Sequence, residues 1–313
     1  MISFISNTVL LNIRDMTTPV QVMLKGFQPY SLTSYHYFRD FDFDKQLPKL
    51  FPLGAPKLFA DSGAFSAATQ GAQIDIDDYA RWLTKHKKHF LTYANFDVIG
   101  NEKQTAKNQE YLENAYDLTP LPVFHVGADF KILDKLMKDY DYIALGGLVP
   151  FATDRKNLMS YFITCFKMAQ TTGCKFHGFG MTNWKLLKSF PWHSVDSSSW
   201  NAGAIYGRLV FFDGKGEFMK ATLWDKASVY KHGKRFRALG LDPEWFVDKE
   251  KYKRVYACLV DGVAWAQASL WLTQYWQQDI KVYFSNAENI SDVATLTAFI
   301  LGENYGLEHK VDG

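Results

Sequence analysis

Short apolar runs that end in polar or glycine-rich residues recur along the middle of the chain. The first, Lys57–Ala60, follows the breakers Pro52, Gly54 and Pro56 and leads into Asp61. Runs of this length are too short for helices and predict buried strands that open into loops. The other runs end within residues 90–97, 121–127, 142–147, 174–180 and 193–199.

Helical segments lie between these runs, at Lys103–Tyr116, Phe130–Lys138, Arg155–Thr171 and Trp184–Lys188. Strands that alternate with helices across short links are typical of parallel βα units. The spacing of the strand ends is close to the roughly 31 residues per unit of an eight-unit barrel of about 250 residues. The pattern therefore predicts an α/β fold of the (β/α)8, or TIM barrel, type, with functional groups at the carboxyl ends of its strands.

The start of the chain departs from this pattern. Val20–Leu24 predicts the first barrel strand, and the aromatic and polar segment from Tyr30 to Phe41 predicts a long loop after it.

The second half of the chain also departs from the alternation. Arg208–Phe212 and Glu217–Leu223 flank the turn Asp213–Gly216 and predict a β-hairpin insertion. The apolar segment Val255–Trp276 predicts a long, buried helix. We expect residues 1–313 to form one domain, in which residues 224–313 are a C-terminal helical appendage packed on the barrel.

Composition limits the classes of protein that fit. A chain of 313 residues with 47% hydrophobic residues can bury one barrel-sized core with a small addition. The formal net charge is only +2, so a polyanionic partner would have to meet a local basic patch. The apolar start of the chain lacks the basic flank of a signal peptide, and no apolar run approaches about 18 residues. We therefore expect a soluble, cytoplasmic protein with no membrane partner.

Four motifs, in this order along the chain, resemble the tRNA-guanine transglycosylase family, including its viral relatives that place 7-deazaguanine bases in DNA. Asp61–Ser66 (DSGAFS) is similar to the family's Asp-Ser-Gly-Gly-Phe/Tyr-Gln, and Gly146-Gly147-Leu148 to its Gly-Gly-Leu. His177–Gly180 (HGFG) resembles its Met-Gly-Val-Gly, and Val195-Asp196-Ser197 falls where the family keeps its nucleophilic aspartate. The resemblance covers residues 57–222.

The cysteines set the chain apart from the tRNA-acting members. Those relatives carry a zinc site of the form Cys-x-Cys-x-x-Cys with a later His, whereas Cys165, Cys174 and Cys258 are scattered singly. They indicate reduced thiols packed as small hydrophobic side chains. We expect no zinc subdomain, no metal and no cofactor.

The resemblance implies roles for two carboxylates. Asp196 would be the nucleophile that captures the sugar as the base leaves, and Asp61 the acid and base that protonates the departing guanine. From the residues alone, a structural role for each, such as capping of the next helix by Asp61, is an equal alternative.

The resemblance also implies a site for the base. Asp97 matches the base-reading aspartate, Ser62 and the backbone at Gly147 and Leu148 match its donors, and His125 stands in place of a glutamine. A core histidine is the alternative for His125. Phe65 would stack on one face of the base, with His177, beside Gly178 and in place of the family methionine, on the other.

These residues imply a pentosyltransferase that replaces guanine in a polynucleotide with a free 7-deazaguanine base through a covalent Asp196 intermediate. The expected polymer is DNA, with tRNA as the alternative, because the zinc ligands are missing and the loop Ser197–Trp200 resembles the viral branch. A catalytically inactive nucleic-acid-binding relative, and a hydrolase that releases the base, are the other hypotheses. Trp200 would stack on the opened strand, and phosphates would be held by Lys231, Lys234, Arg235 and Arg237. The alternative is that Trp200 is core and that the basic stretch is solvated.

Overall fold

A computed structural model describes residues 24, 27–148, 155–285 and 290–301 of the chain. Eight strands form one curled sheet in the order β3-β2-β1-β10-β7-β6-β5-β4, and every pairing within it is parallel. The strands are β1 (Tyr30–Ser34), β2 (Lys57–Asp61), β3 (Phe90–Tyr93), β4 (Val123–His125), β5 (Tyr142–Gly146), β6 (Lys175–Gly178), β7 (Ser194–Ser197) and β10 (Lys281–Ser285).

The two edges of this sheet meet. Ala94, just after β3, forms a parallel bridge with Leu121, just before β4. The Leu121 N–H donates to the Tyr93 carbonyl at 2.8 Å, and the Asn95 N–H donates to the Leu121 carbonyl at 3.0 Å. This eight-stranded α/β arrangement is compatible with a TIM-like barrel.

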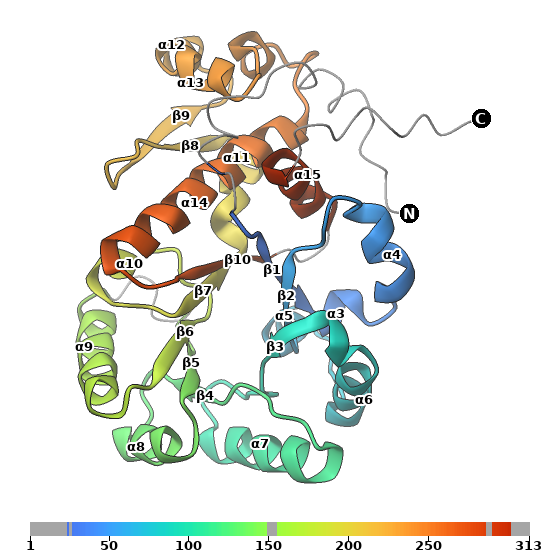
Figure 1. Cartoon of the computed structure of the whole chain (residues 1–313), viewed down its shortest axis with the longest axis vertical. Coiled ribbons are helices and arrows are strands. Elements are labelled where there is room, and N and C mark those ends of the chain that lie inside the picture. The colour runs from blue at the N-terminus through green and yellow to red at the C-terminus, as the bar shows by residue number, and fades with distance from the viewer. Residues whose placement is uncertain (1–23, 25–26, 149–154, 286–289, 302–313) are drawn as a thin grey trace.

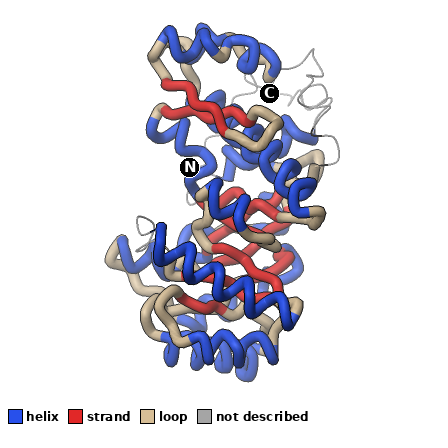
Figure 2. The backbone as a smooth tube through the Cα atoms, turned by 90° about the vertical axis from the view of Figure 1, so that its left-hand side faces the viewer, coloured by secondary structure: helices blue, strands red, loops and turns tan. Residues whose placement is uncertain are grey.

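Helices surround the ring of strands in Figure 1 and flank the sheet in Figure 2. Asp75, Asn101, Asp129 and Asn183 begin four of them, each accepting a backbone N–H of the first turn through its side chain. The helices that follow the strands are α3 (Tyr35–Phe38), α4 (Phe43–Leu50), α5 (Ala64–Thr69), α6 (Ile76–His86), α7 (Glu102–Tyr116), α8 (Phe130–Asp139), α9 (Arg155–Thr172), α10 (Trp184–Ser189), α14 (Arg254–Trp276) and α15 (Ile290–Leu301), with the 3-10 turn η1 (Lys87–His89) before β3.

Between β7 and α14 the chain leaves the sheet and forms a separate antiparallel pair, β8 (Arg208–Phe212) with β9 (Phe218–Thr222). Asp261 of α14 ties this segment to the barrel side, because its carboxylate accepts the N–H groups of Gly203 at 2.7 Å and Val210 at 2.8 Å. Burial raises the pKa of Asp261 to about 7. The same segment contains η3 (Ser198–Asn201), α11 (Ala202–Tyr206), α12 (Lys226–Lys231), α13 (Gly233–Ala238) and η4 (Pro243–Phe246).

The six strands predicted from the middle of the chain are all present, but the prediction for the first strand was wrong. β1 is Tyr30–Ser34, inside the segment predicted to be a loop, and of Val20–Leu24 only Leu24 is described. The prediction relied on apolar runs to find buried strands. Ser31 and Thr33 of β1 are polar but fully buried, so this strand did not stand out. Their hydroxyls donate to the carbonyls of Phe284 at 3.0 Å and Phe59 at 3.4 Å.

The description of residues 224–313 as a C-terminal helical appendage also needs correction. β10 lies in the sheet between β7 and β1, so this part of the chain completes the sheet. The long insertion between β7 and β10 interrupts the regular spacing that revealed the other strands.

α14 is nonetheless the long buried helix that the sequence predicted. Among the described residues it is the one helix long and apolar enough to cross a membrane, and 78% of its apolar window is buried inside the protein. Burial of this extent makes α14 a core helix of this fold. The three cysteines are free and buried.

Gly63, just after β2, lies where the backbone is tightly packed. Its φ is +70°, and an added Cβ would lie 2.0 Å from Ser34 Oγ and 2.7 Å from His36 Cβ. Gly71 has the same φ, +71°, with nothing within 4 Å of an added Cβ. We predict that Gly63→Ala lowers the free energy of unfolding by about 1–3 kcal/mol more than Gly71→Ala, because only Gly63→Ala adds overpacking to backbone strain. Urea denaturation measures both, and equal losses would contradict the packing described.

Candidate functional site

A cavity of about 410 Å³ lies at the carboxyl ends of the strands, and three carboxylates line it. Asp61 ends β2, Asp97 follows β3, and Asp196 is in β7.

Asp61 is poised to exchange a proton near neutral pH. Burial, followed by the negative charges of Asp97 and Asp196, raises the pKa of Asp61 from 3.8 to about 7, although the backbone N–H groups of Gly63 and Ser62 act in the opposite direction. The Gly63 N–H donates to Asp61 Oδ2 at 2.9 Å and fixes the carboxyl group. A general acid and base needs a pKa of this kind.

Asp196 is held by one of its two oxygens. Its Oδ1 accepts the Gly180 N–H at 3.0 Å and lies 3.2 Å from His177 Nε2. No hydrogen bond from the described residues reaches its Oδ2. The carboxylate is therefore fixed in place with one oxygen left for chemistry in the cavity.

Asp97 is paired with a buried histidine. His125 Nε2 lies 2.8 Å from Asp97 Oδ2, and His125 Nδ1 lies 2.8 Å from Glu102 Oε1 at the start of α7. Burial lowers the pKa of His125, but the hydrogen bonds and charges of Asp97 and Glu102 outweigh burial and raise the pKa to about 9. His125 is therefore an imidazolium at neutral pH that donates to both carboxylates and orients Asp97 in the cavity wall.

The two glycines after β5 let the backbone approach this pair. A Cβ on Gly146 would lie 2.8 Å from Val123 Cγ1 and 3.1 Å from His125 Cδ2. Gly147 has a φ of +69°, with an added Cβ 3.3 Å from His125 Cβ. Side chains at these positions would push the backbone away, so glycine is required for Gly146, Gly147 and Leu148 to line the cavity as they do.

The structure thus places Asp61, Ser62, Asp97, Gly146, Gly147, Leu148 and Asp196 around one cavity, as the sequence analysis expected. His125 is different: it lies behind Asp97, with both ring nitrogens already bonded to carboxylates, instead of facing a base. The side chain of Phe65 lies outside the described part of the structure.

His177 and Gly178 need correction as base-contacting residues. The His177 ring is fully buried, and its nitrogens point to Asp196 and Ser194. Gly178 packs against Trp192, whose Cζ3 would lie 2.8 Å from an added Cβ. The aromatic side chain that lines the cavity from this segment is Phe179. From the HGFG motif, Phe179 therefore lines the cavity, and the buried His177 contacts Asp196 from behind it.

Trp200 is not a surface platform. Only 1% of it is exposed, and its Nε1–H donates to the Ser285 carbonyl at 2.9 Å while its ring packs against Phe284. Of the two interpretations, the core alternative is correct. Burial of the indole stabilises the join between η3 and β10 and leaves no face for a nucleic-acid base.

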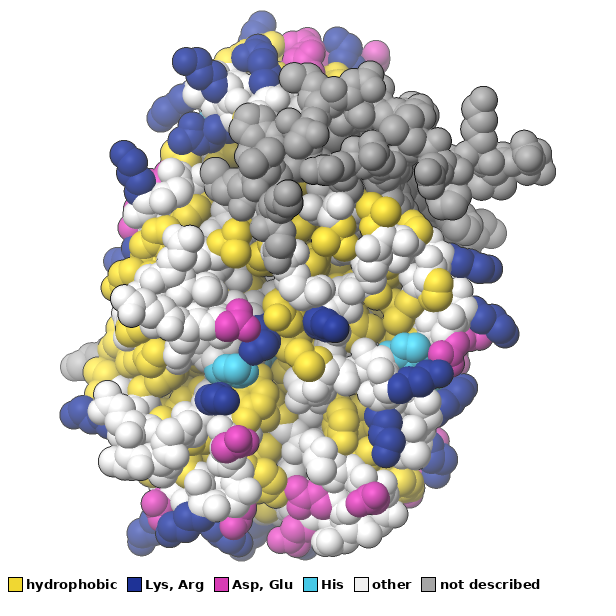
Figure 3. Space-filling view, viewed as in Figure 1, with side chains coloured by type: hydrophobic (Ala, Val, Ile, Leu, Met, Phe, Trp, Pro, Cys, Tyr) yellow, Lys and Arg dark blue, Asp and Glu magenta, His cyan; other side chains and the backbone are white. Residues whose placement is uncertain are grey.

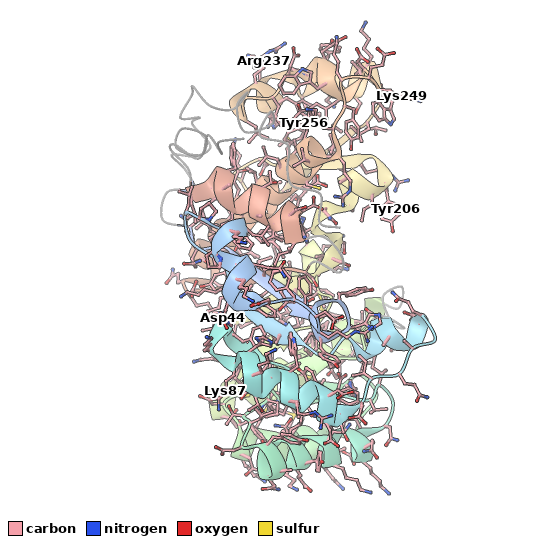
Figure 4. The ribbon with its side chains drawn as sticks, turned by 90° about the vertical axis from the view of Figure 1, so that its right-hand side faces the viewer. Asp44, Lys87, Tyr206, Arg237, Lys249 and Tyr256 are labelled. Carbon is pink, nitrogen blue, oxygen red and sulfur yellow. The ribbon has the colours of Figure 1, made fainter. Side chains whose placement is uncertain are left out.

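The basic stretch lies away from the cavity. Lys231, Lys234 and Arg237 are exposed, Arg235 is partly buried, and none of the four lines the cavity. They belong to α12 and α13, which Figure 1 shows beyond α14 at the top of the molecule; Figure 4 places Arg237 there too. Lys and Arg side chains gather over this end of the face shown in Figure 3. The structure therefore does not join this stretch to the candidate site.

Sequence reasoning missed Glu102, Ser194, Tyr142 and Phe179. The position of Glu102 could have been used to find it. Glu102 is the first residue of α7, after the N-capping Asn101, and only a short loop separates it from Asp97. Ser194 and Tyr142 carried no usable signal, since a serine and a tyrosine inside strands are ordinary sheet residues.

Among the described residues, no group of three or more His, Cys, Asp and Glu side chains is arranged to hold a metal ion. Comparison of the chain with protein-family models, with curated proteins and with solved structures found no match. The case for a function therefore depends on the geometry of the site and on the sequence motifs.

The raised pKa of Asp61 gives a testable dependence of stability on pH. The folded-state pKa is about 7 and the ordinary value is 3.8, so between these pH values the unfolded chain loses the proton first and stability falls. Asp61→Asn cannot titrate, so its free energy of unfolding should rise relative to wild type as the pH increases from about 4 to 8. Urea denaturation across this range measures the difference, with Asp134→Asn on exposed α8 surface as the control. A difference that is constant with pH would contradict the assigned pKa.

Proposed function

We propose that this protein is a base-exchange transglycosylase that replaces guanine in DNA with a free 7-deazaguanine base, such as 7-cyano-7-deazaguanine. One observation supports this above all: a carboxyl group with a pKa of about 7, Asp61, and a carboxylate with one free oxygen, Asp196, line the same cavity. When its environment keeps one carboxyl group protonated and a second one stays ionised, the first can act as the acid and the second as the nucleophile.

The first half-reaction breaks the bond between guanine and the sugar. Asp196 Oδ2 attacks the anomeric carbon as the C–N bond breaks. The electron pair of the C–N bond leaves with the base. Asp61 gives its proton to the departing guanine, which is released neutral. The sugar remains bonded to Asp196 through an ester oxygen.

The second half-reaction restores both carboxyl groups. The incoming 7-deazaguanine base gives a ring N–H proton to the Asp61 carboxylate and attacks the anomeric carbon through that nitrogen. The ester bond breaks, and the electron pair returns to Asp196. No cofactor takes part, since the reaction only exchanges one base for another.

The cavity wall offers the contacts that a guanine-like edge needs. Asp97 has one oxygen bonded to His125 and the other available to accept from a ring N–H and an amino group. Ser62 and the backbone at Gly147 and Leu148 supply donors for the carbonyl. We assign Phe179, which lines the cavity, to one face of the base.

DNA is the proposed polymer on two grounds: the chain lacks the cysteine spacing of the tRNA-acting relatives, and the serine loop after Asp196, which lines the cavity, resembles that of the viral DNA-modifying branch. The target base would have to leave the stack to reach the cavity, at a cost of a few kcal/mol. In this proposal the fold is a (β/α)8 barrel with a hairpin insertion and no zinc subdomain. The protein acts in the cytoplasm, that of the host if it is viral.

Incubation of the full-length protein with guanine-labelled DNA and guanine-labelled tRNA in parallel, each with labelled 7-deazaguanine base, tests the proposal. We expect guanine release and base incorporation in DNA. Asp196→Asn and Asp61→Asn should each slow exchange by about 100-fold or more, because each removes a group that acts in the reaction. Asp134→Asn is the matched control and should exchange as wild type.

The outcomes separate the alternatives. Exchange in tRNA alone would overturn DNA as the polymer, and release of guanine without incorporation would identify a hydrolase. Binding of polynucleotide without release would identify an inactive relative. Wild-type rates in either aspartate variant would contradict the roles assigned to Asp196 and Asp61.

A further inference from the structure

A chain of hydrogen bonds runs from Asp196 into the interior of the sheet. Asp196 Oδ1 lies 3.2 Å from His177 Nε2, His177 Nδ1 lies 2.6 Å from Ser194 Oγ, and Ser194 Oγ lies 2.6 Å from the Tyr142 hydroxyl. The residues come from three neighbouring strands, β5, β6 and β7, and the register pairs His177 directly with Ser194. His177 and Ser194 are fully buried.

The direction of every proton in this chain follows from what each group can donate. An ionised carboxylate can only accept hydrogen bonds. His177 Nε2 must therefore carry a proton and donate a hydrogen bond to Asp196. If the imidazole is neutral, Nδ1 has no proton and accepts from the Ser194 hydroxyl. Ser194 then accepts from the Tyr142 hydroxyl, whose pKa is raised by burial so that the phenol keeps its proton.

An imidazolium would break this order. Both of its nitrogens would donate, and Ser194 would have to turn its proton toward Tyr142. Among the described residues Ser194 is the one hydrogen-bond partner of the Tyr142 hydroxyl, so the proton of that hydroxyl would be left without an acceptor. The neutral form with the proton on Nε2 satisfies every group, and an unsatisfied buried donor is costly.

Packing holds the imidazole in this orientation. The ring centroids of Phe59 and Phe179 each lie 4.7 Å from the centroid of His177, and that of Tyr283 lies 6.0 Å away. The ring contacts aromatic edges and faces on several sides, so the line from Nε2 to Asp196 is fixed. His177 therefore acts on the carboxylate without lining the cavity.

We propose that His177 is the positioning residue of Asp196, and that Ser194 and Tyr142 hold His177 in the tautomer that makes this possible. The catalytic consequence depends on the function proposed above, whereas the tautomer does not. With Oδ1 held by His177 and by the Gly180 N–H, Oδ2 is the oxygen that reacts. In the ester, Oδ1 becomes the carbonyl oxygen and keeps both donors. When the ester breaks, both N–H groups stabilise the returning charge.

The tautomer is tested without any assay of activity. NMR of the full-length protein labelled with 15N in its imidazoles distinguishes protonated from unprotonated ring nitrogens. We expect His177 to carry a proton on Nε2 and none on Nδ1 near neutral pH. Ser194→Ala should change the Nδ1 signal of His177, and exposed Ser189→Ala, the control, should leave it unchanged. A proton on Nδ1, alone or together with one on Nε2, would overturn the inference.

The positioning role is tested by kinetics. His177→Leu, Ser194→Ala and Tyr142→Phe should each slow formation of the covalent adduct, with the largest effect for His177→Leu. The loss of one hydrogen bond to a charged group corresponds to about 10-fold or more in rate. Affinity for the polynucleotide should stay near that of wild type, because none of the three residues lines the cavity. His177→Gln, whose amide can donate to Asp196, should recover part of the rate lost in His177→Leu.

These results separate the inference from the function on which it depends. If His177→Leu lost affinity as much as rate, or if His177→Gln recovered none of the rate, the positioning role would be overturned. His177 would then contribute only packing. If wild type showed no exchange, the proposed function and the catalytic role would both fall, while the NMR result on the tautomer would stand by itself.

Discussion

Repulsion among three carboxylates that line one cavity of about 410 Å³ is the constraint on which the rest of the site depends. Carboxylates that share a poorly solvated site cannot all carry an unbalanced charge. The protein resolves this differently for each of them. Asp61 keeps its proton up to about pH 7, Asp97 accepts from the His125 imidazolium, and Asp196 accepts from His177 and a backbone N–H. The base exchange that we propose needs a neutral acid and a fixed nucleophile, and this division would supply both.

Two buried histidines give the carboxylates different supports. His125 lies between Asp97 and Glu102 and is charged, with a pKa of about 9. His177 has one carboxylate and one hydroxyl as partners, and that donor count favours a neutral ring. His125 therefore supplies positive charge to the Asp97 side of the cavity, and His177 orients Asp196, the proposed nucleophile.

The sequence predicted what depends on local pattern. Apolar runs that end in polar tips located six strands and the carboxylates at their ends, because strand periodicity and breakers act over a few residues. β1 escaped because its buried Ser31 and Thr33 are satisfied by carbonyls of neighbouring strands, which no local pattern records. For a related reason the sequence left Trp200 open between a core and a surface position and misplaced His177. Whether an aromatic side chain faces a cavity or the core depends on strands that are distant in sequence.

Locating the covalent intermediate would test most directly whether Asp196 is the nucleophile. Full-length protein mixed with guanine-containing DNA, without free base, would be quenched with acid, digested and analysed by mass spectrometry. We expect a sugar-linked adduct on the peptide that contains Asp196 and none in Asp196→Asn. An adduct on Asp61, or guanine release by wild type with no adduct at any time, would contradict that role.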